Sequence, residues 1–373
     1  MKILLLAQSF EPALGGGPRW TTELAYGLAG RGHDVVVLTR TFEGHRGTVT
    51  PRDHLEVRYL PLFTVRGAAL FRTSLVDASV DEVQPDIVQT SSPSLADALM
   101  PPASRYGIPY VTLFHAQLGA SLPAKAVQWL NVWRLRRRGW ARVAVTSEHW
   151  RQWLRAHGVD ERIVEVIPST VSRIFAQGPV AGVQRERGHL LFVGGLDATQ
   201  SYKRFDLLLQ ACKQLAKAAP PLDWQLSVVG DGNLKASFEQ DAAAAGLSGN
   251  IEFLGRARDE TLRGLYSIAT ATVLPSSDLR EGWGLVLAEA LCCGCPIVLT
   301  SGIGGAQTFG AAPGAVVTAP GDANALAAAL RDALQREPDE RDAERANFAQ
   351  RFHAARVIES YEALYESARS SAW

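Results

Sequence analysis

The chain contains 373 residues, of which 47% are hydrophobic and 20% are charged. At about 150 residues per domain, this length predicts roughly two to three domains with large buried cores. Because 38 basic side chains balance 38 acidic ones, the chain has no global basic field. This balance excludes nucleic acid as a main partner and leaves only local patches to attract anions.

The first part of the chain, residues 1–175, alternates apolar runs with helical stretches, which predicts a doubly wound α/β domain. It begins with a strand candidate and not with a charged and apolar leader, and no apolar span of about 18 residues follows. We therefore expect the body of the protein in the cytoplasm. The strand candidates are residues 2–7, 34–39, 86–90, 109–114, 143–147 and 163–167.

The stretch 173–187 contains two glycines and a proline but few apolar anchors, which indicates an interdomain linker. A second alternating series follows, so residues 188–350 are predicted to form a second doubly wound domain. Three of the four cysteines crowd into residues 292–295 with a spacing unlike that of zinc ligands, and we expect buried thiols in a reducing cytosol. The second set of strand candidates is 190–194, 225–229, 251–254, 271–274, 296–300 and 315–317.

A strand, a loop and a helix follow one another around the nine residues EGWGLVLAE at 281–289. The apolar run 271–274 predicts a buried strand, and the residues after the loop have helical spacing. Gly282 and Gly284 leave the backbone bare where the helix begins, so free N–H groups and the positive end of the helix dipole can meet a phosphate. This pattern indicates a sugar-nucleotide site, with Trp283 lining it between the glycines.

The two carboxylates of this stretch also suggest a glycosidase, but their spacing argues against one. Eight helical residues would put Glu281 and Glu289 about 12 Å apart, beyond the roughly 5 to 9.5 Å that glycoside hydrolysis uses. Glu281 would instead accept hydrogen bonds from sugar hydroxyls, and Glu289 would hold a ribose. Solvated glutamates on a surface helix are the alternative, which the apolar character of the helix disfavours because a buried carboxylate needs a partner.

With its flanks, VLPSSDLREGWGLVLAEALCCGCPIVLT, this stretch resembles the E-x7-E signature of the retaining glycosyltransferases of family 4. The resemblance runs from residue 1 to about 334 and implies the GT-B fold, an α/β architecture of two Rossmann-like, doubly wound parallel-sheet domains that face a central cleft. Residues 1–175 would bind the acceptor, 188–350 the donor, and a helix in 351–373 would cross back to the first domain. The other matching stretches are MKILLLAQSFEPALGGG, ELAYGLAGRGHDVVVLT, LLFVGGLDATQSYKRFDLLLQA, VVGDG and IEFLGRARDETLRGLYSIATATVLPS.

Three glycines open a predicted helix at residues 19–29. In a dinucleotide fingerprint the glycines follow the first strand at once, whereas here residues 8–14 intervene, so a nicotinamide cofactor is disfavoured. N–H groups at Gly16 and Gly17 would instead point across the cleft at the diphosphate of the donor. A flexible surface turn is the alternative.

His115 ends a predicted parallel strand, at the edge where open sheets bind ligands. A single histidine is more often structural. The resemblance implies, however, that it hydrogen-bonds the transferred sugar near the reacting carbon. Most members of the family have an aspartate next, where this chain has Ala116.

Lys203 and Arg204 follow the double glycine that ends with Gly195. Loss of a nucleoside diphosphate leaves negative charge on the leaving oxygens, and fixed cations beside them lower the barrier. The resemblance implies this role for Lys203 and a backbone contact of Ala257 with the nucleotide base. The family's usual arginine is replaced by Gly195, so either Arg204 supplies the missing charge or the enzyme works with one cation fewer. A solvated Lys–Arg pair at a helix start is the alternative.

Two further stretches depart from the family. IPSTVS at 167–172 stands where the family usually has IPNGVD, and Gly304-Gly305-Ala306-Gln307 lacks the glutamate that commonly follows the double glycine. The second stretch lies close to the donor sugar in the family, which implies an unusual sugar specificity.

Five tryptophans lie between residues 122 and 157, interleaved with four arginines at 134–138. Basic residues beside tryptophans suit peripheral contact with an anionic membrane surface, here the inner membrane face, and a lipid-linked acceptor. The stronger interpretation is that Trp129 and Trp133, spaced i and i+4, form the buried face of a helix whose arginines lie in water.

The sequence thus predicts a retaining transferase that moves a sugar from a nucleoside diphosphate, as co-substrate, to an acceptor hydroxyl. No acidic metal cage and no other cofactor site is evident, so metal-independent transfer is expected. The alternatives are a nucleotide-sugar-binding protein without transferase activity and a GT-B sugar-nucleotide epimerase. The catalytic residues would be His115, Lys203 and Glu281, and the donor-binding residues Gly16, Gly17, Gly195, Lys203, Arg204, Ala257, Glu281, Gly282, Trp283, Gly284, Leu285 and Glu289.

Overall fold

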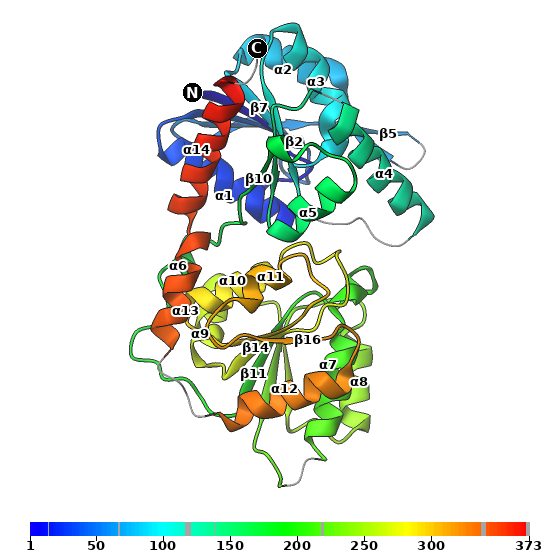
Figure 1. Cartoon of the computed structure of the whole chain (residues 1–373), viewed down its shortest axis with the longest axis vertical. Helices are drawn as coiled ribbons and strands as arrows, with labels where there is room; N and C mark the ends of the chain where they lie inside the picture. The colour runs from blue at the N-terminus through cyan, green and yellow to red at the C-terminus, as the bar shows by residue number, and fades with distance from the viewer. Residues whose placement is uncertain are drawn as a thin grey trace. The chain divides into compact units, whose positions relative to one another are not determined.

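The protein divides into two compact units, each built on a mostly parallel sheet (Figure 1). The first combines Met1–Thr170 with Ala354–Trp373, and the second is Val171–His353. The computed structural model describes residues 1–13, 15–65, 68–115, 121–137, 139–217, 220–336 and 341–370.

The sheet of the first unit has eight strands in the order β10-β9-β8-β7-β1-β2-β4-β3. All neighbours pair in parallel except β3 and β4. Because the chain builds outward from β1 in both directions, the switch point lies between β1 and β7, where ligands of doubly wound sheets bind. The strands are β1 (Lys2–Leu6), β2 (Asp34–Arg40), β3 (Gly47–Arg52), β4 (Leu55–Leu60), β7 (Ile87–Thr90), β8 (Tyr110–Phe114), β9 (Arg142–Val145) and β10 (Val164–Val166), beside a separate hairpin of β5 (Leu62–Val65) and β6 (Ala68–Phe71).

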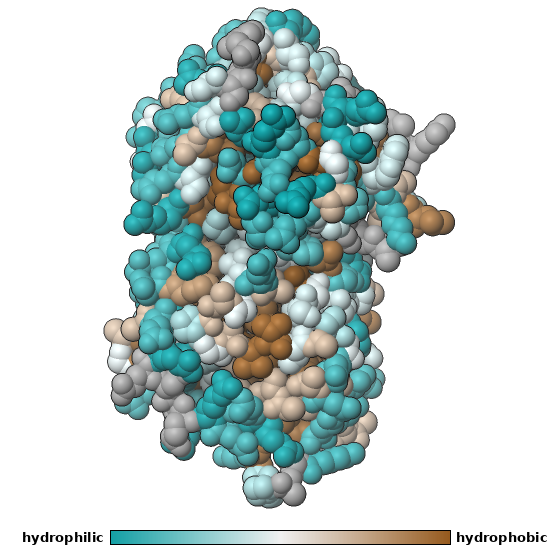
Figure 2. All heavy atoms as spheres, in the orientation of Figure 1, coloured by the Kyte–Doolittle hydropathy of each residue, from teal (hydrophilic) through white to brown (hydrophobic). Residues whose placement is uncertain are grey.

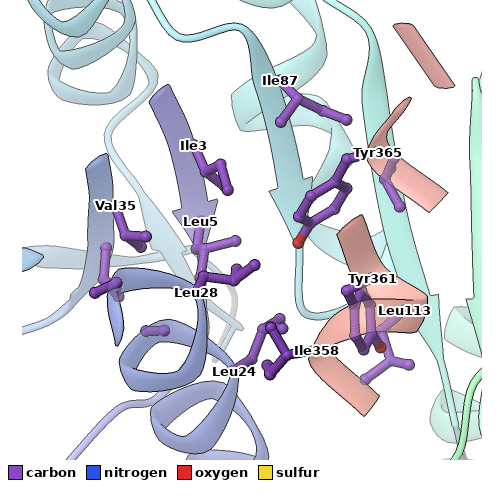
Figure 3. Close-up of a cluster of buried hydrophobic side chains, with 14 of the residues drawn as sticks. Ile3, Leu5, Leu24, Leu28, Val35, Ile87, Leu113, Ile358, Tyr361 and Tyr365 are labelled. Atoms are coloured by element: carbon purple, nitrogen blue, oxygen red, sulfur yellow. The ribbon is translucent and has the colours of Figure 1, made fainter. Parts of the chain in front are cut away.

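The last helix of the chain completes the core of the first unit. Tyr361 and Tyr365 of α14 (Ala354–Ser370) are fully buried in one cluster with Leu24 and Leu28 of α1 (Gly16–Gly30) (Figure 3). The Tyr365 hydroxyl lies 2.5 Å from the side-chain oxygen of Gln89 on β7 and donates to it. The other helices of this unit are α2 (Thr73–Val83), α3 (Ala96–Arg105), α4 (Leu122–Arg137) and α5 (Glu148–Ala156).

The second unit is a six-stranded parallel sheet in the order β13-β12-β11-β14-β15-β16. Its switch point lies between β11 and β14, which pair although two strands separate them in the chain. The strands are β11 (His189–Val193), β12 (Gln225–Val229), β13 (Ile251–Gly255), β14 (Ala271–Leu274), β15 (Ile297–Thr300) and β16 (Val316–Thr318). The helices are α6 (Arg173–Ala176), α7 (Phe205–Leu215), α8 (Lys235–Ala244), α9 (Asp259–Ile268), α10 (Leu285–Cys292), α11 (Ala306–Gly310), α12 (Ala323–Gln335) and α13 (Asp342–Ala349).

Every strand that the sequence predicts has an observed counterpart, but strands β3 to β6 were missed. β3 is exposed along its whole length, so it carries no apolar signal, and β4 alternates buried and partly buried residues instead of forming a continuous apolar run. The stretch 173–187, interpreted as a linker, packs on the second unit instead. Phe175 is fully buried there, and the Arg185 guanidinium donates to the Ala269 carbonyl at 2.6 Å and pairs with Asp342 at 2.7 Å.

The four cysteines are buried and free, as expected. Burial raises the pKa of Cys212 and, together with the charge of Glu289, that of Cys292, each to about 12. Among the described helices, none combines the length and the apolar character that crossing a bilayer needs.

Replacing Ile358 by Ala tests the packing of α14. Ile358 is 1% exposed and faces Gly27 so closely that a Cβ on Gly27 would lie 2.6 Å from its side chain. We expect a loss of about 2–5 kcal/mol in unfolding free energy, because a cavity replaces the side chain. Urea denaturation measures it. The matched control is Arg356→Ala in the same helix, whose side chain is 74% exposed, and equal stability of the two variants would contradict the packing.

Candidate functional site

Lys203 and Glu281 come together where the order of strands reverses in the second sheet. The loop after β11 leads through a 3₁₀ helix (Ala198–Lys203) to Lys203, and the loop after β14 leads to Glu281. Doubly wound sheets bind ligands at the carboxyl ends of strands paired in this way. The Lys203 ammonium donates to a Glu281 carboxylate oxygen at 2.6 Å across this edge.

The ion pair is largely shielded from water, since each side chain is 13% exposed. Burial by itself lowers the pKa of Lys203, but the attraction of the Glu281 carboxylate, with a smaller contribution from Tyr202, outweighs it, and the net pKa is raised. Lys203 therefore stays protonated at neutral pH. The site thus places a protonated ammonium beside a carboxylate at the carboxyl edge of the sheet.

A second cation adjoins this pair. The Arg280 guanidinium lies 4.9 Å from the centre of the Tyr202 ring, and the Lys203 ammonium lies 5.5 Å from the same ring. The Arg280 side chain also donates three hydrogen bonds to Asp278, at 3.0, 3.1 and 2.8 Å, which raise its pKa. Tyr202 and Arg280 were not predicted from the sequence, although each directly precedes a predicted site residue.

Arg204 and Gly195 occupy different positions in the same loop. Arg204 adopts a left-handed conformation with φ 53°, at the start of α7, and its guanidinium donates to Asp206 at 2.9 Å. At Gly195 a Cβ would lie 2.6 Å from the side-chain amide of Gln200. The space that a larger side chain at position 195 would use is therefore filled by Gln200.

The signature stretch differs from a continuous helix. α10 begins only at Leu285, which is partly buried, and Gly284 precedes it with φ 99°. Glu281 therefore lies in the loop, and the expected separation of about 12 Å, which assumed eight helical residues, does not apply. The Glu281 carbonyl accepts a hydrogen bond from the Gly304 N–H at 2.9 Å, which joins this loop to the double glycine before α11.

Trp283 and Glu289 point into the core of the second unit. The centre of the Trp283 ring lies 4.8 Å from that of Phe309 and 5.7 Å from that of Phe352. The buried Trp283 ring is therefore part of the core. Glu289 is 2% exposed and accepts a hydrogen bond from the Tyr266 hydroxyl at 3.1 Å. Burial, followed by the charge of Glu289, raises the pKa of Tyr266 well above its ordinary value. Tyr266 is thus a partner of the kind that a buried carboxylate needs.

The expected residues of the first unit lie at the carboxyl edge of its sheet. His115 directly follows β8, is partly buried, and has its pKa lowered by burial, so it is neutral at pH 7. Ala116 lies outside the described residues. α1 begins at Gly16, and no described atom lies within 4 Å of a Cβ placed on Gly16 or Gly17. Packing within the described protein therefore does not require these glycines.

Ala257 is partly buried beside the core of the second unit, just after β13. It therefore also lies at the carboxyl edge of the second sheet. A separate cavity opens at the opposite edge, where Thr270 and Pro296 precede β14 and β15. Arg185 lines that cavity. Its guanidinium donates to Asp342 and to backbone carbonyls, so its charge stabilises the fold of the second unit.

Two doubly wound sheets, each with a switch point in its strand order, define a two-domain α/β protein. A family model described as Glycosyltransferase Family 4 matches residues 14–173, and one described as Glycosyl transferases group 1 matches residues 181–351. The chain belongs to this family of glycosyltransferases and has the GT-B fold.

Relatives of this family resemble the chain over different lengths. A D-inositol 3-phosphate glycosyltransferase of Geodermatophilus obscurus is 34% identical over 180 residues, which are 44% of this chain but only 39% of that protein. A 2-deoxystreptamine glucosyltransferase of Streptomyces kanamyceticus is 27% identical over 67% of this chain and 68% of its own.

Solved structures match the whole fold at low identity. Anabaena HepE in complex with UDP has a TM-score of 0.77 and 19% identity, over 98% of this chain and 100% of that one. Sucrose-phosphate synthase of Thermosynechococcus elongatus has a TM-score of 0.74 and 20% identity, over 98% and 97%. At this level of identity the likeness establishes the fold.

A double-mutant cycle measures the coupling of Lys203 and Glu281. We expect Lys203→Met and Glu281→Gln each to lower the unfolding free energy by roughly 3 kcal/mol, because either change leaves a shielded polar group without its partner. The double variant should lose less than the sum, with a coupling of about 1–3 kcal/mol in urea denaturation. Additive losses would contradict the ion pair.

Proposed function

We propose that this protein transfers a sugar from a nucleoside diphosphate sugar to an acceptor hydroxyl, with retention of configuration at the anomeric carbon. The observation that carries the proposal is the Lys203–Glu281 pair at the carboxyl edge of the second sheet. This edge is where doubly wound sheets bind nucleotides. A cation and a carboxylate side by side suit a ligand that combines a diphosphate with sugar hydroxyls.

The diphosphate would bind Lys203, Arg280 and backbone N–H groups at the start of α10. Lys203 carries its charge close to the loop of Gly282 and Gly284, and Arg280 lies against the same tyrosine ring. Fixed cations stabilise the negative charge that develops on the leaving oxygens. Both arginines bond an aspartate two residues away, but Arg280 also lies against the Tyr202 ring beside Lys203, so Arg280 and not Arg204 supplies the charge missing at Gly195 in this proposal.

The other predicted site residues would contact the sugar, the diphosphate, the base and the ribose of the donor. Glu281 and the neutral His115 would position the transferred sugar, and Gly16 and Gly17 would offer N–H groups to the diphosphate. Ala257 would meet the base through its backbone. Glu289 would bind the ribose with the carboxylate held by Tyr266, whose hydrogen bond fixes its orientation.

Transfer proceeds on one face of the sugar in this proposal. The bond between the anomeric carbon and the leaving phosphate oxygen breaks, the acceptor oxygen bonds to the same face, and the acceptor proton passes to the departing phosphate. Lys203 and Arg280 balance the charge, so transfer needs no metal ion or other cofactor. We therefore expect EDTA to leave the rate of sugar transfer unchanged.

The names of relatives support the choice of donors. HepE was solved with UDP and with UDP-glucose, and one curated relative is a glucosyltransferase. UDP-glucose therefore belongs in the first donor panel, together with other UDP-sugars and with GDP- and ADP-sugars. The acceptor is a hydroxyl compound, such as a glycolipid, a polysaccharide or a small molecule.

A donor panel tests the proposed reaction, with release of nucleoside diphosphate and formation of an α-linked or β-linked product followed by NMR. We expect at least one donor to be turned over with its anomeric configuration retained. Glu281→Ala should lower kcat by about a thousandfold or more, because the sugar loses its positioning contact. Glu239→Ala on α8, at a half-exposed position, is the control and should keep full activity.

Other outcomes of the panel would favour different functions. If no donor reacts but one raises the melting temperature, the protein is a nucleotide-sugar-binding protein. If the sugar is isomerised without an acceptor, it is an epimerase. Inversion of configuration or full activity of Glu281→Ala would contradict the proposed mechanism.

Arg280 and Arg204 form a matched pair for testing the second cation. Each guanidinium is bonded to an aspartate two residues away, and their side chains are 33% and 30% exposed. We expect Arg280→Gln to lower kcat/KM by about ten- to a hundredfold, the value of a charged hydrogen bond, and Arg204→Gln to leave it within about twofold of the original. The reverse order in steady-state kinetics would assign the charge to Arg204.

A further inference from the structure

Helix α4 is anchored by the more polar of its two faces. Asn131 is buried, and the buried Arg134 guanidinium donates to Asp97 at 2.5 Å and to the Asn131 side chain at 3.2 Å. The Arg134 carbonyl accepts the Trp140 indole N–H at 3.1 Å. Val132 and Leu135 are the apolar contacts on this side. The expectation that Trp129 and Trp133 form the buried face of this helix, with its arginines in water, is therefore wrong, because both tryptophans are exposed and Arg134 is buried.

The opposite face of α4 is apolar and exposed. Leu122, Ala126, Trp129 and Trp133 are spaced by four, three and four residues, which places them in one stripe along the helix. Leu122 is 82% exposed, Trp129 69% and Trp133 40%. Figure 1 shows α4 at the margin of the first unit, and Figure 2, in the same orientation, shows hydrophobic side chains standing out at this margin.

This arrangement reverses the rule for a surface helix, whose apolar stripe normally faces the core. Exposing a tryptophan and a leucine to water costs free energy that burial would recover, at about 25 cal/mol per Å² of apolar area. The polar side chains of Asn131 and Arg134, by contrast, are removed from water and form hydrogen bonds within the protein. A helix held in this way presents an apolar surface for something outside the unit.

The charges around the stripe select the kind of surface that it fits. Lys125, Arg136 and Arg137 are exposed, and the helix contains no aspartate or glutamate. Lys125 lies one turn before Trp129, and Arg136 lies one turn after Trp133, so both adjoin the stripe. Tryptophan and leucine between cations suit the boundary between anionic headgroups and acyl chains, where the rings bury and the cations meet phosphate. A second copy of the same helix would bring its cations against these cations.

We propose that this face of α4, defined by Leu122, Trp129 and Trp133 with Lys125, Arg136 and Arg137, docks on an anionic phospholipid membrane. Only side chains enter the interface, and the helix lies on the surface without crossing it. The stripe begins seven residues after His115, which the chain spans in at most about 25 Å. Docking therefore brings the sugar-transfer edge of this unit close to lipid. Given the proposed function, which this last step rests on, the acceptor hydroxyl belongs to a lipid-linked molecule.

Vesicle flotation of the full chain tests the docking. We expect the protein to float with phosphatidylcholine vesicles that contain phosphatidylglycerol, not with phosphatidylcholine alone, and to be released by high salt. The double variant Leu122→Ser, Trp129→Ser should lose flotation. Each of Lys125→Gln, Arg136→Gln and Arg137→Gln should lower partitioning about fivefold. Leu254→Ser, which removes a leucine of the second unit that is 39% exposed, is the control and should float as before.

Three results would overturn the docking. The first is failure of the original protein to float with anionic vesicles at low salt, and the second is unchanged flotation of the double variant. The third is dimerisation in light scattering that Trp129→Ser abolishes, which would assign the stripe to a second copy of the chain. Circular dichroism confirms that the variants fold. Donor hydrolysis in detergent-free buffer reports on the proposed function separately, so either proposal can fail alone.

Discussion

The Lys203–Glu281 ion pair joins the two loops on which the proposed site depends. These loops leave β11 and β14, the strands between which the order of the second sheet reverses. The Ser277 N–H donates to the Tyr202 carbonyl at 2.9 Å, and together with the ion pair this backbone hydrogen bond holds the two loops to each other. In the proposed site the Lys203 ammonium of this pair lies beside glycine-rich backbone, where the diphosphate would bind. The Tyr202 ring contacts both Lys203 and Arg280, so a second cation lies next to the pair.

Neighbouring side chains of the second unit occupy the space around this pair. Gln200 fills the space beside Gly195, and the Trp283 ring is a core contact of Phe309, so the loop offers backbone where the family resemblance suggested side chains. The Tyr266 hydroxyl satisfies Glu289 inside the core. A charged ligand site can lie against a packed apolar cluster only because each inward-pointing polar group of this kind has a partner.

Much of the fold could be predicted because apolar periodicity is local. The runs that became β1 and β11 are buried on both faces, so nearly every side chain carries the signal. β3 carries none because it is exposed throughout. The stretch 173–187 has linker-like composition, yet Arg185 binds carbonyls some 80 residues away, a contact that no local pattern encodes. The candidate site residues Lys203 and Glu281 could be predicted from motifs. Arg280 could not, because what places it beside Lys203 is its contact with the Tyr202 ring of another loop.

The sequence by itself determined the parallel α/β architecture, the family and the motifs that carry its charges, since these follow from the order of residues along the chain. Tertiary structure alone decided which charges meet. Arg204 and Arg280 look equivalent in the sequence, each two residues from an aspartate, but only Arg280 lies over the Tyr202 ring beside Lys203. Likewise the spacing of α4 shows a tryptophan stripe but not which way it faces. The direction follows from tertiary packing, because Arg134 binds Asp97 on the buried side of the helix and Trp129 is left exposed on the other side.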